Sequence, residues 1–498
     1  MSDALTELRE RLAEISDLNA AGGLLGWDQQ TMMPARAAES RAEQLGTLGK
    51  LVHERFTDDA IGRLLDAAQP APGSTDDALV RVTRRDWEKA RRVPSELAAE
   101  LARAGALGHQ AWVAARERAD FGAFLPSLRR NVELKLRYVE CFDGYDDPYD
   151  VLLDDYEEGM TSAEVDALFA ELRSGLVPLI AAIAERAGAV DASVLHGDFP
   201  VEGQRALVGR VLRQLGWSAD GWRLDEAAHP FATSFGPADV RLTTRYDAAY
   251  VGMALYGAIH EFGHGLYESQ VDPALARTPL GEGVSLGVHE SQSRLWENVV
   301  GRGRPFAGWL HAQLCEVFPE RFGAVGSEAL YRAVNKVQPS LIRVEADEAT
   351  YGLHIILRFE LERAMIAGTV ALEELPEAWN ARMQQYLGVE VPNDAVGVLQ
   401  DVHWSGGDIG YFATYALGNL IAAQLWERAR EDLPDLDAQL AAGDGSALRA
   451  WLGSHVHRFG RTYPPRELVR RAVGGPISVQ PFLDYLNAKL RPIYGLEA

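Results

Sequence analysis

Apolar side chains recur along most of the chain at the spacings of three and four residues that mark one face of an α-helix. In the opening segment this face is formed by Leu5, Leu8, Leu12, Ile15 and Leu18. The segment 161–172 begins with Thr161 and carries Glu164 three residues later, which is the spacing of a capping box at a helix N-terminus. The pattern therefore predicts a mainly α-helical protein.

Alternation of apolar and polar residues, which indicates a strand, is rare in this chain. The clearest case is the segment 239–246, where Asp239 and Arg241 alternate with apolar residues. This predicts an edge strand whose polar side faces a cleft, although a surface salt bridge between the two residues is the alternative. We expect an all-α fold with one small β-element near residues 230–246.

The chain carries no fixed-period repeat and no low-complexity tail, and its clearest loop, 67–77, is too short for a flexible linker. A length of 498 residues suits two or three average domains or one large enzyme with a deep cleft. We predict a single domain over residues 1–498, with helices up to about residue 220 and the polar motifs in 221–498.

The charge and cysteine content narrow the class of partner and the compartment. The formal net charge is −23, from 49 basic and 72 acidic residues, so nucleic acid and anionic membrane surfaces are poor partners. The two cysteines, Cys141 and Cys315, form no disulfide framework, which favours a reducing cytoplasm. The N-terminus lacks an apolar signal core, and the apolar stretch 176–184 is too short to span a bilayer.

Candidate chemistry begins with two histidines, His260 and His264, four residues apart in an apolar segment that Pro273 brings to an end. On a helix these residues lie on one face, so both imidazoles can point at one metal ion. Glu261 sits at the rim of that face, where it can act as the base that activates water. The alternative is a pair of buried core histidines without a metal.

A catalytic metal of this kind takes a third protein ligand. We predict Glu290, on a second helix over 287–301, with Glu297 two turns further on as the backup choice. Glu268, one turn beyond the second histidine of the pair, is better suited to an outer or surface position. Zinc is the default metal for such ligands, and cobalt or manganese would also be accepted.

The segment 340–360 carries a polar stripe where a core helix should be apolar. The stripe is formed by Arg343, Asp347, Tyr351, His354 and Arg358. Arginine–aspartate pairing on a solvated face would explain it, but the tyrosine and histidine favour the wall of a wet cleft. In a second polar stretch, 397–418, glycines predict irregular backbone, and His403 and Tyr411 are donors that could face a developing oxyanion. The alternative there is a tyrosine-rich loop packed on the core.

Several motifs in one order give the chain a resemblance to a known family. They are HPF at 229–231, DVRLT at 239–243, HEFGH at 260–264, HESQ at 289–292, IRVEAD at 342–347 and GVLQDVHW at 397–404, together with LLGWDQQTMMP at 24–34 and PFLDYLNAKLRPIYG at 481–495. The chain resembles the carboxypeptidase Taq family of metallopeptidases over nearly its whole length. The resemblance implies an all-helical fold with a long, deep groove, similar to the angiotensin-converting-enzyme and neurolysin group.

The resemblance also implies a homodimer. It further implies the removal of single residues from peptide C-termini with broad specificity. It assigns the metal to His260, His264 and Glu290, and the general base to Glu261.

By the same resemblance, Arg343 takes the C-terminal carboxylate of the substrate, and His403 and Tyr411 stabilise the tetrahedral intermediate. Arg241 corresponds to an arginine of the groove. Two alternatives stay open: an oligoendopeptidase or dipeptidyl carboxypeptidase on the same fold, and a helical interaction protein with an inactive site.

Overall fold

Helices make up most of the structure, a computed structural model that describes residues 3–497. The helices before the sheet are α1 (Asp3–Thr31), α2 (Ala38–Phe56), α3 (Asp59–Ala67), α4 (Thr75–Arg92), α5 (Ser95–Glu117), α6 (Phe121–Val139), α7 (Pro148–Leu153), α8 (Ser162–Ala184) and α9 (Val201–Leu215). These helices fill the region up to about residue 220 that the sequence predicts to be helical. The predicted capping box is also present: the Thr161 side chain accepts a hydrogen bond from the Glu164 N–H, and the Glu164 carboxylate accepts one from the Thr161 N–H.

The second half holds the sheet and the remaining helices. The strands are β1 (Trp222–Glu226), β2 (Ala232–Ser234) and β3 (Val240–Thr244). They are followed by α10 (Val251–Ser269), α11 (Leu286–Arg294), the π-helix η6 (Leu295–Gly301), α12 (Arg304–Val317), α13 (Pro319–Phe322), α14 (Ser327–Val334), α15 (Glu348–Ile366) and α16 (Leu375–Leu387). The chain closes with α17 (His403–Gly406), α18 (Ala413–Asp432), α19 (Leu436–Ala441), α20 (Ser446–His455), α21 (Pro465–Val473) and α22 (Gln480–Tyr494).

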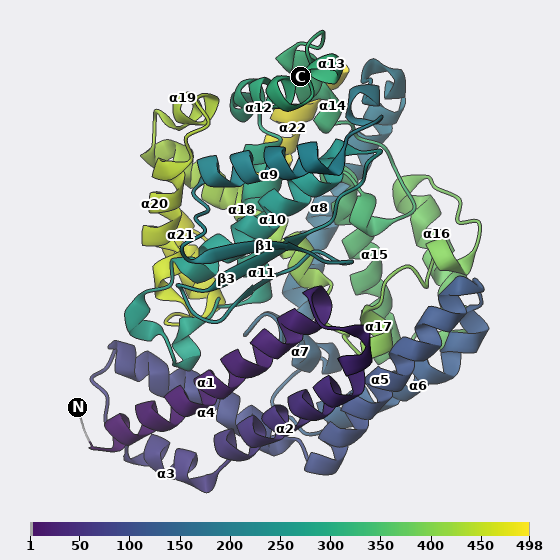
Figure 1. The fold of residues 1–498 in the computed structure, drawn as a ribbon. Coiled ribbons are helices and arrows are strands. Elements are labelled where there is room, and N and C mark those ends of the chain that lie inside the picture. The colour runs from purple at the N-terminus through teal and green to yellow at the C-terminus, as the bar shows by residue number, and fades with distance from the viewer. Residues whose placement is uncertain (1–2, 498) are drawn as a thin grey trace.

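The small sheet has the strand order β1-β3-β2, with β1 parallel and β2 antiparallel to β3. The β-element is where the sequence predicts it, but the edge-strand prediction for 239–246 is wrong, because β3 is the central strand. Val240 and Leu242 on β3 are fully buried. They face α10 at Gly265, where an added Cβ would lie 2.8 Å from Val240 Cγ1. The missing side chain thus lets the sheet lie directly on α10, and the two overlap in Figure 1.

Two large apolar cores meet at α18. One core packs α8, α15, α16 and α22 together, and the other surrounds α9, α10 and α12. Leu417 and Leu420 of α18 belong to the first core, and Ile421 and Leu425 belong to the second. Because two faces of α18 contact different cores, this helix fixes the position of α11, which packs along it, relative to both.

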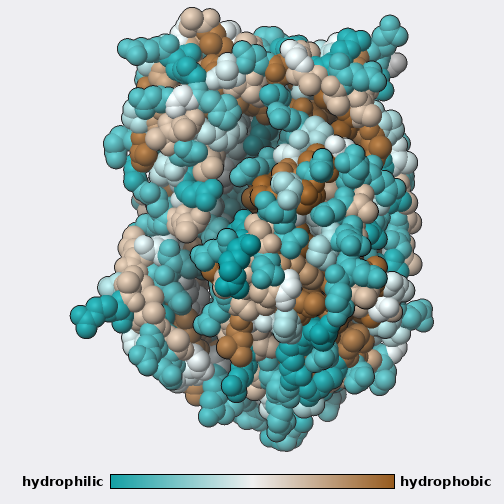
Figure 2. All heavy atoms as spheres, turned by 90° about the vertical axis from the view of Figure 1, so that its right-hand side faces the viewer, coloured by the Kyte–Doolittle hydropathy of each residue, from teal (hydrophilic) through white to brown (hydrophobic). Residues whose placement is uncertain are grey.

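Helices α1–α6 form the lower part of the molecule, opposite the end where the C-terminus lies (Figure 1). A small third core joins α1, α3 and α4 to the loop after α10 through Leu8, Leu12, Leu79 and Leu275. Figure 2 shows that one face of the molecule is hollowed by a deep groove with hydrophilic residues along its walls.

The stretch 176–184 is the end of α8, which is longer than its apolar run alone predicts. By length and composition α8 is the one described helix that could cross a membrane, and a single such helix is weak evidence of a membrane span. Its Phe169, Leu172 and Leu176 are buried in the first core.

Candidate metal centre

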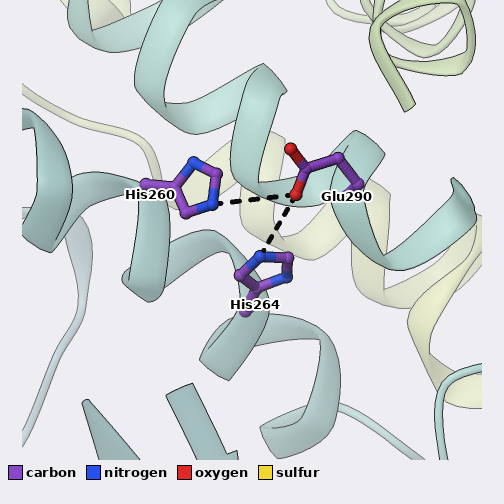
Figure 3. Close-up of side chains that lie close together, drawn as sticks. All are labelled: His260, His264 and Glu290. Carbon is purple, nitrogen blue, oxygen red and sulfur yellow. Dashed lines mark ion pairs between the residues drawn. The ribbon is translucent and has the colours of Figure 1, made fainter. Parts of the chain in front are cut away.

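The two histidines of the HExxH motif and Glu290 converge on one point. His260 and His264 lie one turn apart on α10, and Glu290 reaches them from α11 (Figure 3). Glu290 Oε2 is 3.7 Å from His260 Nε2 and 3.4 Å from His264 Nε2. One ligand atom from each residue fits within 4.8 Å of the others. The structure brings together the three residues that the sequence singled out, and they have the donor types of a catalytic metal site.

Two glycines let the helices approach closely enough for this geometry. An added Cβ at Gly263, between the two histidines, would lie 2.5 Å from the Gln292 carbonyl oxygen on α11. An added Cβ at Gly418 on α18 would lie 2.7 Å from the Glu290 side chain. Because backbone and a buried carboxylate cannot move away cheaply, a side chain at either position would displace α11 and with it Glu290.

Glu297 lies beside the cluster rather than in it. Its carboxylate accepts from His260 Nδ1 at 2.8 Å, and it is paired with Arg302 at 2.7 Å. The charge of Arg302 keeps the pKa of the buried Glu297 carboxyl well below its usual range. Glu297 belongs to the π-helix η6, whose wider turn follows α11 directly, so the predicted helix over 287–301 changes type at Leu295. Glu297 thus contacts the His260 nitrogen that faces away from Glu290, and it does not lie where the three side chains converge.

Glu290 is held by neighbours on its own helix. Arg294 Nε donates to Glu290 Oε1 at 2.7 Å, and Ser293 Oγ donates to Oε2 at 2.9 Å. Burial would raise the pKa of Glu290, but Arg294 and the two histidines hold that pKa well below its ordinary value. The carboxylate is therefore ionised, as a metal ligand must be.

The second histidine has a different neighbour. His264 Nδ1 lies 2.7 Å from His289 Nδ1, and His289 Nε2 lies 2.8 Å from Glu268 Oε1. Burial lowers the pKa of His264 to about 4, so its imidazole is neutral at physiological pH. Glu268 occupies the outer position that its place on the helix predicts.

Glu261 is buried beside the cluster. Among the described residues none hydrogen-bonds to its carboxylate, in contrast to Glu290 and Glu297. Burial raises the pKa of Glu261 to about 7, with the negative charges of those two glutamates acting in the same direction. A carboxylate with unfilled acceptor positions and a pKa near neutrality has the properties of a general base.

The polar stripe of 340–360 does not lie along one helix. Helix α15 begins at Glu348, and Asp347 is its N-cap, accepting from the Ala349 and Thr350 N–H groups at 3.0 Å. Arg343 lies before the helix, in the short 3₁₀ turn Arg343–Glu345. The single-helix prediction is wrong because the aspartate side chain satisfies the free N–H groups of a helix start and so begins a new helix there.

Two arginines of the stripe share one counter-ion that the sequence did not single out. Asp401 accepts from Arg343 Nη2 at 2.7 Å and from Arg358 Nε at 2.6 Å. Arg358 and His354 are fully buried, so neither forms a cleft wall. Burial lowers the pKa of Arg358 to about 10 and that of His354 to about 3. The segment carries acidic residues of its own, such as Asp347 four positions after Arg343, so no local feature of the sequence pointed to the distant Asp401 as the partner.

Contacts connect Arg343 to the metal cluster. Arg343 Nη1 donates to the Tyr351 hydroxyl at 3.1 Å. The guanidinium of Arg294, which holds Glu290, lies 4.1 Å from the centre of the Tyr351 ring. Arg343, Tyr351, Arg294 and Glu290 thus form one continuous set of contacts.

The segment 397–418 is irregular around its glycines, as predicted. Gly407 and Gly410 have positive φ angles of 82° and 99°. The rings of His403 and Tyr411 lie 5.2 Å apart. His403 Nε2 is 3.3 Å from the hydroxyl of Tyr415, which the sequence reading did not assign.

His403 and Tyr411 both carry a hydrogen that they can donate at neutral pH. Burial lowers the pKa of His403 to about 4, so its ring is neutral. Burial raises the pKa of Tyr411, and the charge of Glu290 contributes to the increase. Both groups therefore carry a proton to donate at neutral pH.

A buried glutamate anchors this segment through hydrogen bonds. Glu362 on α15 accepts from Trp404 Nε1 at 2.8 Å, from the Tyr149 hydroxyl at 2.8 Å and from the Gly410 N–H at 3.0 Å. Its sequence context, LRFELER, reads as an ordinary helix and gave no sign of this role. The two ends of the turn between His403 and Tyr411 are thus tied to one carboxylate.

Arg241 has a structural setting. It pairs with Asp239 at 2.9 Å, which matches the alternative reading as a salt bridge, and it lies 4.4 Å from the centre of the Trp27 ring. Among the described residues its polar partner is this aspartate, so Arg241 joins the sheet to α1. The structure does not place it in contact with the His–His–Glu cluster.

A helical fold with two histidines from HExxH and a glutamate from the next helix has the form of a metal-dependent peptide hydrolase. The sequence profile of the carboxypeptidase Taq (M32) metallopeptidase family matches residues 7–490. The chain belongs to this family, and it is a metallocarboxypeptidase, a hydrolase that acts at the C-terminus of peptides.

Relatives match over nearly their whole length. The chain is 42% identical to thermostable carboxypeptidase 1 of Thermus thermophilus, with 99% of each chain covered. It is 38% identical to carboxypeptidase 1 of Bacillus subtilis, with 98% of each covered. The crystal structure of the M32 carboxypeptidase from Deinococcus radiodurans R1 is 44% identical, with a TM-score of 0.97 over 99% of this chain and 100% of that one. These matches confirm the predicted fold class and function, and they do not favour the oligoendopeptidase alternative.

Proposed function

We propose that His260, His264 and Glu290 hold the divalent metal ion that this family requires, with zinc as the default and cobalt or manganese as substitutes. The donor set supports this assignment. The Nδ1 atoms of both histidines are occupied by protein partners, which leaves the two Nε2 atoms facing Glu290 Oε2. When bound, the metal supplies Lewis acidity that polarises the scissile carbonyl and acidifies water.

The protein's own side chains transfer the proton and stabilise the oxyanion. Glu261 removes a proton from the attacking water and returns it to the leaving amine. His403 and Tyr411 donate hydrogen bonds to the oxyanion as it develops. Neutral His403 and protonated Tyr411 can do this without first changing their charge.

Arg343 binds the terminal carboxylate of the substrate and so sets the cut one residue from the end. The observation that carries this role is the contact set that joins Arg343 through Tyr351 and Arg294 to Glu290. Asp401 and Tyr351 use three of the five guanidinium N–H groups of Arg343, which leaves two for a carboxylate. For Arg241, whose contacts are with Asp239 and Trp27, we propose a role in holding the groove wall rather than in binding substrate.

The whole chain acts as one catalytic domain, and we propose that it works in the cytoplasm as a homodimer. Two free cysteines support a reducing compartment. The dimer rests on the family resemblance, and its mass in solution by light scattering tests it.

A free-acid peptide and its C-terminally amidated twin test the role of Arg343. The wild type should cut the free acid far faster, because the amide has no charge to pair with the guanidinium. Arg343→Ala should lower kcat/KM for the free acid by roughly 30-fold to several-thousand-fold, from about 2–5 kcal/mol for a shielded charge pair. It should leave the amide nearly unchanged.

Arg343→Lys retains the charge without the two parallel donors, and exposed Arg428→Ala serves as the control. Equal cleavage of the two peptides by the wild type would contradict the carboxypeptidase assignment of Arg343 while leaving the metal assignment untouched.

A further inference from the structure

The two ligand histidines are supported in different ways. His260 Nδ1 contacts a carboxylate directly, at 2.8 Å from Glu297 Oε2. His264 Nδ1 instead contacts a second imidazole, that of His289, at 2.7 Å, and the carboxylate of Glu268 comes only after it. A neutral imidazole can present either nitrogen as the donor, so this arrangement has to select one tautomer in each ring.

The proton positions follow from the carboxylate end. Glu268 can only accept, so His289 Nε2 carries a hydrogen. In the tautomer that donates through Nε2, Nδ1 of His289 carries no hydrogen and accepts from Nδ1–H of His264. His264 Nε2 is left without a hydrogen, and this is the atom that faces Glu290 at 3.4 Å.

Packing holds the His289 ring in the orientation that these hydrogen bonds need. The Tyr267 ring lies 5.2 Å away, centre to centre. On another side an added Cβ at Gly283 would lie only 2.6 Å from His289 Cδ2. Among the described residues Glu268 forms its ion pair with His289, whereas the Glu297 carboxylate is also paired with Arg302.

We propose that His289 and Glu268 are positioning residues for the metal, which fix His264 as an Nε2 ligand through a two-step hydrogen-bond relay. The inference rests on the proposed function, because it takes His264 to be a ligand. It assigns to His289 a role separate from that of its neighbour Glu290. Partners of this kind typically change metal affinity by roughly 10–100-fold when they are removed.

The experiment measures Zn²⁺ affinity by competition with a chromophoric chelator, using the full-length protein. His289→Phe keeps the ring shape but has no acceptor, and it should weaken Zn²⁺ binding by roughly 10–100-fold. His289→Gln can accept from His264 and donate to Glu268, so it should restore most of the affinity. Glu268→Ala should fall between these two, because His289 is then free to take the other tautomer.

A second readout and two controls make the result decisive. In the Co²⁺-substituted protein, His289→Phe should alter the visible absorption of the metal, and His289→Gln should not. Exposed His53→Phe should change neither quantity. Wild-type affinity and spectrum in folded His289→Phe would overturn the proposal, and if that variant does not fold, unchanged affinity in Glu268→Ala would overturn it. His264→Ala separates the two claims, because wild-type affinity in that variant would contradict the metal site itself.

Discussion

The metal centre and the N-terminal hairpin, formed by α1 and α2, differ in which side chains they bury and which they expose. Helix α11 buries Glu290, Ser291, Gln292 and Ser293, four polar residues in a row. Helix α2, with nineteen residues, buries none, and the hairpin that it forms with α1 leaves Leu24 and Met32 exposed. Polar groups are thus concentrated inside at the centre, whereas on the hairpin some apolar groups lie outside, although α1 buries Leu8 and Leu12 in the third core.

The difference teaches where the fold is tightly determined. A buried polar group is costly unless every partner is in place, so the centre permits one arrangement. Apart from the apolar residues of α1 that enter the third core, the hairpin is held by surface ion pairs such as Arg277–Asp17 and Arg55–Glu14, which typically contribute less than about 1 kcal/mol each. Changes at the centre should therefore have large, specific effects, and changes on the hairpin should have small ones.

The largest effect is expected for Glu261→Gln. The ligands are untouched, so metal content should stay at the wild-type level, while loss of the base should lower kcat by roughly 10²–10⁴-fold. Metal analysis together with steady-state kinetics on a free-acid peptide checks both parts. Near-wild-type turnover in the metal-loaded variant would remove Glu261 from the mechanism.

Glu362→Gln tests the buried carboxylate through the pH dependence of stability. Burial raises the pKa of Glu362 to about 7, above the value near 4.3 of an unfolded chain. The native state holds its proton more tightly, so the free energy of unfolding falls as pH rises from about 4.3 to about 7 and then levels off. This group should account for a loss on the order of 3–4 kcal/mol.

Glu362→Gln should remove that part of the slope in urea unfolding measured between pH 4.5 and 8. Exposed Glu373→Gln should keep the wild-type slope. An unchanged slope in Glu362→Gln would show that Glu362 titrates as it does in the unfolded chain.

Glu297→Ala sharpens the comparison by removing a partner and no ligand. Zn²⁺ affinity should fall by roughly 10–100-fold, because His260 loses the acceptor that orients it. Exposed Glu316→Ala should bind Zn²⁺ as the wild type does. A complete loss of binding with Glu297→Ala would instead make this glutamate a ligand.

The smallest effect is expected on the hairpin. Leu24→Ser and Met32→Ser should each change the free energy of unfolding by no more than about 0.5 kcal/mol, because these side chains are already exposed. Urea unfolding at two protein concentrations checks this. A larger loss that depends on concentration would break the comparison and show that a second copy of the chain covers the hairpin.

The sequence by itself determined what depends on neighbours in the chain. The i, i+4 spacing of His260 and His264 places them on one helical face wherever that helix packs. The Thr161 capping box depends on a side chain and backbone three residues apart, so it was also readable. Motifs in a fixed order along the chain were enough for the family and its fold.

Only the tertiary structure decided the partners of the buried charges. Asp401 lies 58 residues from Arg343, and Glu362 lies 42 residues from Trp404. No local rule specifies which of many acidic residues will meet a given buried donor. Packing of the first core, which includes Leu399, Trp404 and residues of α15, brings them together, and the cost of an unpaired buried charge then holds each pair in place. For the same physical reason, Glu297 could be identified as a neighbour of the site from sequence, but its place beside His260 rather than in the ligand set could not.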